Sequence, residues 1–295
     1  MTALPFYIVD VFAEKKYAGN QLGVFPQAQG LSDAQMQQLA KEMNYSETTF
    51  ILSREPRDGG YDVRIFTPDK EVPFAGHPTL GTAFVIQQEF IGQPLDTVIL
   101  NLKVGQIPVN FSYREDRPDT LTMQQKEPSF GATLDSPAIA EILNLKTVDL
   151  DDRFPVEEVS TGLTFLIVPL KTLKSLRQIK VNTDKCSSLM DNLNAKAILA
   201  FCPQTHNKKN NLCARVFAHY YGVPEDPATG SANGCLAGYL VKNGYWGDHH
   251  IDIRVEQGYE IGRPSLLYLK AQENQGKIEV FVGGKVIQVA MGKFV

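Results

Sequence analysis

Residues 71–83 read EVPFAGHPTLGTA, and a related segment, EDPATGSANGCLA, follows at residues 225–237. Each segment places a glycine before a polar residue and then continues as a run without charge, which is typical of a helix buried on every side. The repeat therefore predicts two similar halves, each built around a buried helix. Four positions are identical at a constant offset of 154 residues (225 minus 71): Glu71 and Glu225, Pro73 and Pro227, Gly76 and Gly230, Ala83 and Ala237.

The beginnings of these two helices are candidate anion-binding sites. The first N–H groups of a helix have no partner within it and carry about half a positive charge. Gly76 and Gly230 would let the backbone approach a ligand closely, although tight turns also require glycine. If the two halves face each other, one cleft receives both helix starts.

The length and the order of the expected elements predict two domains. A chain of 295 residues exceeds the size of about 100 to 200 residues that is usual for one domain. The charged connection REDRPD, at residues 114–119, favours a boundary there, with an N-terminal domain over 1–117 and a C-terminal domain over 118–283. The last strand, about 284–295, would rejoin the N-terminal domain. Strands outnumber helices and are often joined directly, so we expect an α+β fold with mixed sheets curled around central helices.

The charge and the first residues bear on partners and location. A net charge of -4 without a dense cluster of Lys and Arg argues against nucleic acid or an anionic membrane as a partner. The opening run MTALPFYIVDVF lacks the features of a signal peptide, and no apolar run reaches the roughly 20 residues of a transmembrane helix. We therefore expect a cytoplasmic protein.

The sequence predicts neither a metal site nor a nucleophile. The cysteines have no metal-ligand spacing and no neighbouring histidine, and most have apolar neighbours, which is typical of reduced, buried thiols. His249 and His250 are adjacent, so they would point apart in a strand. A phosphate loop and a GxSxG motif are both missing from the sequence. Acid/base chemistry by side chains, without metal or cofactor, is the remaining expectation. The four cysteines are Cys186, Cys202, Cys213 and Cys235.

Glu47 is the first candidate for acid/base chemistry. It lies in NYSETTFIL, where an apolar strand follows a helix, so its carboxylate risks partial burial. Desolvation would raise its pKa toward the range that is useful for proton transfer. The alternative is a solvated residue at the end of a strand, since most glutamates are exposed.

Other candidates lie close to the two helix starts. His77 could donate to a substrate, or its side chain could only cap the first helix. Ser231 is typical of a helix cap, and Asp226 could stabilise the dipole of the second helix without any catalytic part. Asn20, in AGNQLG, is most often a turn residue but is a further candidate for substrate binding.

Four runs of this sequence resemble the PhzF family, the phenazine-biosynthesis-type isomerases related to diaminopimelate epimerase. The resemblance covers nearly the whole chain. It implies two pseudo-symmetric domains, each a mixed curled sheet or barrel around a central buried helix, with a catalytic cleft between them, and a homodimer. It also implies a proton-shuttling glutamate, which falls on Glu47, assisted by His77, Asp226 and Ser231. The runs are NYSETTF, EVPFAGHPTLGTA, YGVPEDPATGSANG and QGYEIGRPSL.

One departure from the related epimerases affects the expected mechanism. Those enzymes carry opposed cysteines just before the glycine of each helix start, where this chain has Ala75 and Thr229. Neither residue exchanges a proton near neutral pH, so epimerisation by two thiols is lost. One carboxylate that removes a proton from one carbon and returns it to another would instead carry out an isomerisation.

The resulting hypothesis is a cofactor-free isomerase of the trans-2,3-dihydro-3-hydroxyanthranilate type, acting on a small anionic substrate. Backbone N–H groups around Ala75 and Gly76, and around Thr229 and Gly230, would hold the substrate carboxylate. Two alternatives stay open. One is a racemase or epimerase that pairs Glu47 with a second acid, and the other is a binding protein that kept the fold without the activity.

Overall fold

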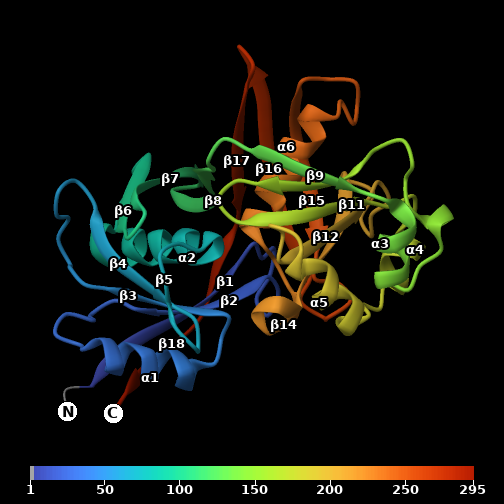
Figure 1. Cartoon of the computed structure of the whole chain (residues 1–295). Helices are drawn as coiled ribbons and strands as arrows, with labels where there is room; N and C mark the ends of the chain where they lie inside the picture. Colours follow the sequence, from blue (N-terminus) through green and yellow to red (C-terminus); the bar gives the residue numbers. More distant parts are fainter. Residues whose placement is uncertain (1–2) are drawn as a thin grey trace. The chain divides into compact units, whose positions relative to one another are not determined.

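The computed structural model describes residues 3–295, and its contacts divide the chain into two compact units (Figure 1). The first unit runs to Met123 and takes in Gly283–Val295, and the second is Gln124–Val282. The expected boundary segment, residues 114–119, is the turn of a hairpin in which Glu115 and Asp116 have φ of 51° and 59°. The first unit therefore continues past residue 117, through most of the hairpin's second strand.

From residue 3 onward, the first unit contains one helix at its outer surface, one central helix and nine strands. Its elements are β1 (Leu4–Val11), β2 (Asn20–Phe25), α1 (Asp33–Met43), β3 (Glu47–Ile51), β4 (Tyr61–Phe66), β5 (Glu71–Val72), α2 (Gly76–Ile86), a π-helical turn η1 (Gln87–Ile91), β6 (Thr97–Leu102), β7 (Gly105–Arg114), β8 (Arg117–Gln124) and β18 (Val286–Phe294).

The second unit has more helices than the first. Its elements are β9 (Ser129–Leu134), α3 (Ser136–Ile142), η2 (Thr147–Asp149), β10 (Val156–Ser160), β11 (Thr164–Pro169), α4 (Leu173–Gln178), α5 (Thr183–Asp191), β12 (Ala197–Cys202), β13 (Leu212–Ala218), η3 (His219–Tyr221), β14 (Val223–Asp226), α6 (Gly230–Lys242), β15 (His250–Gln257), β16 (Ser265–Asn274) and β17 (Lys277–Gly284).

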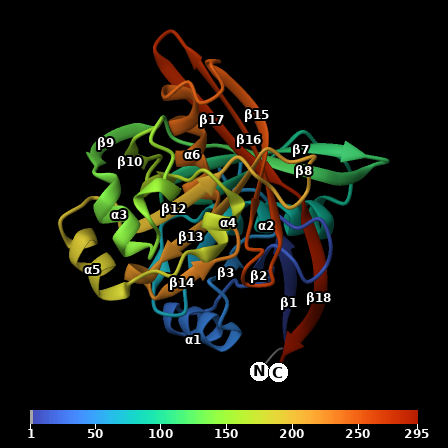
Figure 2. The same cartoon turned by 90° about the vertical axis from the view of Figure 1, so that its right-hand side faces the viewer.

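The same strand pairings recur in both units. In the first, β18–β1 and β1–β2 are antiparallel, β2–β3 parallel, β3–β4 and β4–β5 antiparallel, β4–β6 parallel and β6–β7 antiparallel. In the second, β9, β10, β11, β12, β13, β14, β15 and β16 take the places of β18, β1, β2, β3, β4, β5, β6 and β7 with the same senses. The first and last strands, β1 and β18, pair with each other and lie side by side in both views (Figures 1 and 2). The last strand therefore completes the sheet of the first unit. The predicted duplication and α+β fold are therefore confirmed.

Each unit has a central helix. All eleven residues of α2 are buried, and the helix packs among β1, β2, β3, β6, β7 and β18. In α6 every residue except Ser231 and Lys242 is buried, among β10, β11, β12, β15 and β16. These helices have no polar face because strands surround them, as their uncharged sequences predict.

The other helices cover the outer faces of the sheets. A capping box between Ser32 and Gln35 starts α1, whose Met36 and Ala40 pack on a cluster of phenylalanines. In the second unit α3, α4 and α5 lie beside β12 and β13 and bury their apolar side chains against that sheet (Figure 2). None of the helices in residues 3–295 is both long and apolar enough to cross a membrane.

Candidate active site

The repeated glutamate that precedes each central helix forms the same ion pair in both units. In the first unit, Arg64 on β4 donates to both carboxylate oxygens of Glu71, at 2.8 and 2.7 Å. In the second, Arg215 on β13 donates to both oxygens of Glu225, at 2.9 and 2.6 Å. Bidentate pairs of this kind fix the relative orientation of the two side chains as well as pairing their charges. Each pair therefore ties the short strand before the central helix, β5 or β14, to the strand that carries the arginine.

The two arginines also share an aromatic neighbour. The guanidinium of Arg64 lies over the ring of Phe66 at 5.1 Å, and that of Arg215 lies over Phe217 at 4.8 Å. The duplicated unit is therefore larger than the repeated peptide, since it includes an Arg-x-Phe strand before it. The turn between this strand and the glutamate is three residues longer in the second unit.

Neither central helix is capped by the side chain of the residue that precedes it. The residues that precede them, Ala75 and Thr229, have extended backbones, and neither makes a capping hydrogen bond through its side chain. His77 and Ser231 are each the second residue inside their helix, so the alternative interpretation of both as caps is wrong. Both helix starts keep the partial positive charge of their first N–H groups.

His77 is brought next to Glu47 in the first unit. Its Nε2 atom lies 3.5 Å from Oε2 of Glu47 and 3.3 Å from the carbonyl oxygen of Gln21. A carbonyl oxygen only accepts, so Nε2 carries the proton and donates it to Gln21, with Oε2 of Glu47 as a close neighbour of the same nitrogen. Burial lowers the pKa of His77 to about 3, against the smaller, opposing effect of the Gln21 carbonyl. His77 is thus neutral at neutral pH and acts as a hydrogen-bond donor.

Glu47 is held where β3 begins. The parallel pairing of β2 and β3 sets Glu47 opposite Leu22, one residue beyond the carbonyl that His77 contacts. Its side chain is only 19% exposed, so the alternative that Glu47 is a solvated residue at the end of a strand does not hold. Two residues on, Thr49 accepts a hydrogen bond of 2.8 Å from Thr82 of α2, which fastens β3 to the central helix. The carboxylate is therefore positioned by both β2 and α2.

Asn20 belongs to the same group of elements. It is the first residue of β2, where it pairs with Val11, and it is 2% exposed. The turn lies just before it, at Gly19, where φ is 69° and a Cβ would come within 2.3 Å of a backbone oxygen. The starts of β2, β3 and α2 thus carry Asn20, Glu47 and His77, and the last two lie 3.5 Å apart.

In the second unit a different network lies at the start of α6. The hydroxyl of Thr229 donates to the carboxylate of Asp226 and accepts from Nε2 of Gln257 at 3.1 Å. Gln257 is fully buried, and its Oε1 accepts from the backbone N–H of Thr229 at 3.3 Å and from Asn233 at 2.8 Å. Asp226 therefore belongs to a network that fixes the residue before the helix.

Gln257 and Asn233 were missed among the candidate residues. Both stand in runs that carry the family resemblance, QGYEIGRPSL and YGVPEDPATGSANG, but neither type of side chain exchanges protons. Only the folded chain brings the end of β15 to the start of α6, 28 residues from Thr229 along the sequence.

The equivalent positions in the two units differ in chemistry. Glu47 is the first residue of β3, and the equivalent strand β12 begins with Ala197. His77 of α2 corresponds to Ser231 of α6. Both units have the same strand pairings and the same Arg–Glu ion pair. Only the first unit has a carboxylate at the first residue of the strand, since β3 begins with Glu47 and β12 with Ala197.

The cysteines lie away from the residues just before the helices. All four are buried, and burial raises the pKa of each thiol, to about 12 for Cys202 and about 11 for Cys235. In the folded chain, however, one of them lies close to a histidine that is not its neighbour in sequence. A ring nitrogen of His206, Sγ of Cys213 and a carboxylate oxygen of Glu256 lie within 4.8 Å of one another, an arrangement that could hold a metal ion.

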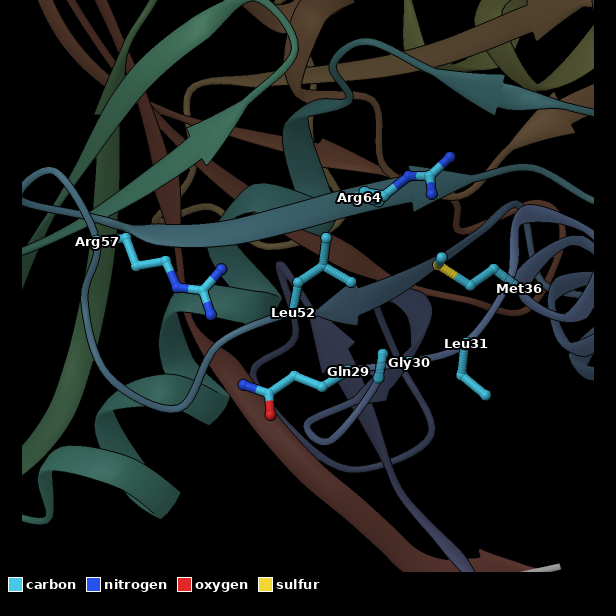
Figure 3. A pocket seen from close by; sticks show the side chains of 8 residues that line it. Gln29, Gly30, Leu31, Met36, Leu52, Arg57 and Arg64 are labelled. Carbon is cyan, nitrogen blue, oxygen red and sulfur yellow. The ribbon is translucent and has the colours of Figure 1, made fainter.

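A pocket of about 380 Å³ in the first unit contains none of the predicted site residues (Figure 3). Arg57 and Arg64 both line it; the side chain of Arg57 points toward Leu52, whereas that of Arg64 points away from it. Arg64 is already paired with Glu71 and with Asp33, at 2.6 Å, so its charge is compensated. The remaining lining residues are Ala28, Gln29, Gly30, Leu31 and Met36.

Comparisons with known proteins agree with this fold and with the resemblance. The chain is 34% identical over 283 residues to the trans-2,3-dihydro-3-hydroxyanthranilate isomerase of Pseudomonas fluorescens, covering 95% of each protein. A crystal structure of a PhzF family phenazine biosynthesis protein from Bacillus anthracis matches with a TM-score of 0.92 at 27% identity, over 100% of both chains. A hydroxyproline epimerase from Agrobacterium vitis shares the fold alone, with a TM-score of 0.65 at 9% identity, over 100% of this chain and 91% of that one.

These matches confirm the expected enzyme class, an isomerase of the PhzF type, and the epimerase-like fold. The family model described as phenazine biosynthesis-like protein matches residues 9–292, nearly the whole sequence. The chain belongs to the PhzC-PhzF family of phenazine biosynthesis-like proteins.

Proposed function

We propose that this protein is a cofactor-independent isomerase that moves a proton on a small cyclic or unsaturated carboxylate, with Glu47 as the general acid and base. The observation that carries the proposal is the carboxylate of Glu47 at 3.5 Å from Nε2 of His77, a histidine that burial keeps neutral. A neutral imidazole can donate its N–H to a carboxylate without protonating it, so Glu47 stays available as a base.

The start of α2 suits the negative charge that such a reaction develops. Removing a proton beside a carboxylate or a conjugated system builds charge on oxygen, and backbone N–H groups at a helix start stabilise charge of this kind. Ala75, the residue before α2, makes no capping hydrogen bond through its side chain, so we propose that backbone around Ala75 and Gly76 contacts the substrate anion, with Asn20 as a further contact. In the second unit we propose that Asp226, Ser231 and the backbone at Thr229 and Gly230 bind polar groups of the substrate.

The difference between the two units favours an isomerase over a racemase or epimerase. Inversion by two bases requires an acid/base group on each side of the carbon, and the related epimerases place a cysteine before each central helix. This chain has Ala75 and Thr229 there, and Ala197 at the position equivalent to Glu47. Asp226 is tied to the Thr229 hydroxyl in the network around Gln257, a poor setting for a second mobile base.

We propose the substrate class by analogy with the relatives. At 34% identity over 95% of each chain, trans-2,3-dihydro-3-hydroxyanthranilate is the first compound to test. It is a cyclic amino acid with a double bond that can move, which suits transfer of a proton between two carbons by one base. We also propose a homodimer, for which light scattering should give a mass near twice 32.8 kDa.

The test is turnover of that compound by Glu47→Gln, followed by ultraviolet absorbance as the conjugated system changes. We expect a fall of about 100- to 10,000-fold, the usual contribution of a general acid/base group. Glu42→Gln, which changes an exposed residue of α1, is the matched control and should keep the parental rate. Equal rates for Glu47→Gln and the parent would remove Glu47 from the mechanism.

A reaction in heavy water separates the isomerase from the epimerase. The isomerase shifts the absorbance and places hydrogen on a different carbon. The epimerase inverts a labelled stereocentre and leaves the absorbance unchanged. Inversion without an absorbance change would reject the proposed function.

A further inference from the structure

A second cluster of reactive side chains lies in the second unit, among residues that the proposed reaction does not use. His206 follows β12, Cys213 is on β13 and Glu256 is on β15, and one ligand atom of each lies within 4.8 Å of the others. Cys213 and Glu256 are fully buried, and the pairing of β13 with β15 sets them directly opposite each other. The geometry of the sheet, and not a flexible loop, therefore holds two of the three groups together.

His206 is fixed in orientation. Its ring stacks on that of Tyr259, with centroids 4.0 Å apart and planes 10° apart. Its Nε2 atom is buried and has no hydrogen-bond partner among residues 3–295, although Oε1 of Glu260 lies 3.7 Å away. Oε2 of Glu260 is likewise buried without a hydrogen bond within that range. Buried polar atoms without partners are costly, so two in one place require an explanation.

The carboxylate of Glu256 has room for one more partner. Its Oε1 accepts from the backbone of Asn207 at 2.8 Å and from the side chain of Asn210 at 2.7 Å. Within the described part of the chain, its Oε2 accepts only from the backbone of His206, at 2.7 Å, which leaves one lone pair on that oxygen. These bonds orient the carboxylate in the way that outer-shell groups orient metal ligands.

The charge of the cluster is negative. Glu256 and Glu260 are both present, and the facing cation is Arg177, whose Nε lies 3.4 Å from Oε1 of Glu260. A bound cation would compensate this charge and satisfy the buried atoms without hydrogen bonds.

We propose that His206, Cys213 and Glu256 bind one divalent cation of the zinc class, with Glu260 supplying the fourth ligand. Imidazole nitrogen, thiolate sulfur and carboxylate oxygen together are typical of Zn²⁺ sites, whereas Mg²⁺ and Ca²⁺ prefer oxygen alone. In a tetrahedral zinc site the ligand atoms lie roughly 3.3 to 3.8 Å apart, so the cluster would have to contract by about 1 Å. Binding would release the proton of the Cys213 thiol to solvent.

Such an ion would have a structural effect on the start of α6. Glu256 and Gln257 are neighbours on β15 and point to opposite sides of the strand. Gln257 holds Thr229 and the backbone carbonyl of Asp226. A metal that fixes Glu256 would therefore also fix the strand residue on which the second unit's network depends.

The test uses the reduced, tag-free full chain after chelation, titrated with Zn²⁺ alone and, separately, with Co²⁺. Calorimetry should give one Zn²⁺ per chain, and Co²⁺ should give the near-ultraviolet absorbance of a cobalt–thiolate bond. Cys213→Ser should abolish that absorbance and weaken binding by about 100-fold or more, since loss of even an outer-shell partner costs about 10- to 100-fold. His206→Gln changes a partly exposed residue and tests the site if Cys213→Ser fails to fold.

The matched control is Cys186→Ser, which removes a buried thiol of α5 and should leave Zn²⁺ affinity and the cobalt absorbance at parental values. The proposal is overturned if the parent binds no Zn²⁺, or if Cys213→Ser and His206→Gln bind it as tightly as the parent. These measurements need no substrate, so their outcome is independent of the isomerase activity.

Discussion

Acidification should destabilise the protein through His77. Burial lowers the pKa of this histidine from 6.5 to about 3 in the folded chain, whereas the unfolded chain exposes an ordinary imidazole. Between these two values the unfolded state binds one proton that the folded state does not. Stability therefore falls as the pH drops below about 6.5, and the loss continues down to about 3.

The magnitude follows from linkage. For an unfolded pKa of 6.5, moving from pH 7 to pH 5 should lower the free energy of unfolding by about 2 kcal/mol through this group alone. The full shift of the His77 pKa, from 6.5 to about 3, corresponds to a loss of about 5 kcal/mol in the free energy of unfolding, at about 1.4 kcal/mol per pKa unit. A loss of this size is a large part of the stability that most domains have.

The assay compares urea unfolding of the parent and His77→Asn at pH 7, 6 and 5. The variant has no imidazole to protonate, so its stability should fall by about 2 kcal/mol less than that of the parent over this range. His250→Asn, which changes an exposed histidine, is the control and should follow the parent. A second measurement follows the ring protons of His77 by NMR, which should keep their chemical shifts from pH 7 to pH 5.

Parallel stability curves for the parent and His77→Asn would refute the reasoning. So would a His77 signal that titrates near pH 6.5. Either result would mean that the ring is charged in the folded chain at mild acidity, and the proposed role of a neutral His77 beside Glu47 would fail with it.

Two further predictions concern stability. Arg215→Met should cost about 3 to 5 kcal/mol because it leaves Glu225 buried without its partner, and adding Glu225→Gln should recover part of that loss. Arg64→Met should cost less, since that pair is more exposed, and urea unfolding checks all three. Gly258→Ala should cost about 2 to 4 kcal/mol, because φ is 77° and a Cβ would lie 2.4 Å from a backbone oxygen. Gly276→Ala, at φ of 79° in open space, should cost only about 1 to 2 kcal/mol, and equal losses would contradict the packing argument.

The repeated peptide was enough to predict the two central helices, because a helix that is buried on every side has no charged residues along its buried length. The uncharged runs after Gly76 and Gly230 became the buried helices α2 and α6. The boundary at residue 117 could not be placed in the same way. A charged run with a proline is typical of a linker, but it is equally suited to a hairpin turn, and the antiparallel pairing of the two flanking strands, β7 and β8, decided between them.

The sequence did not predict the two Arg–Glu ion pairs, and the reason is the spacing of the residues. Arg64 and Arg215 are 151 residues apart, whereas the glutamates that they bind are 154 apart. Comparing the sequence with itself at one constant offset detects equivalent residues only where the turns between them have equal lengths in both units. The network around Gln257 is harder still to predict, since it depends on contacts between distant strands and on side chains without acid/base chemistry.

The duplication explains why one unit can carry proton chemistry while the other holds its helix start by hydrogen bonds alone. The strand pairings, the buried helix and the arginine anchor are present in both units, so the shared features are those that stability requires. The positions that the scaffold leaves open are the residues at the strand and helix starts. There the first unit has Glu47 and His77, and the second has Ala197 and Ser231. A two-base epimerase needs the same chemistry at both starts, whereas a one-base isomerase needs it at one, so the asymmetry of these four residues favours the isomerase.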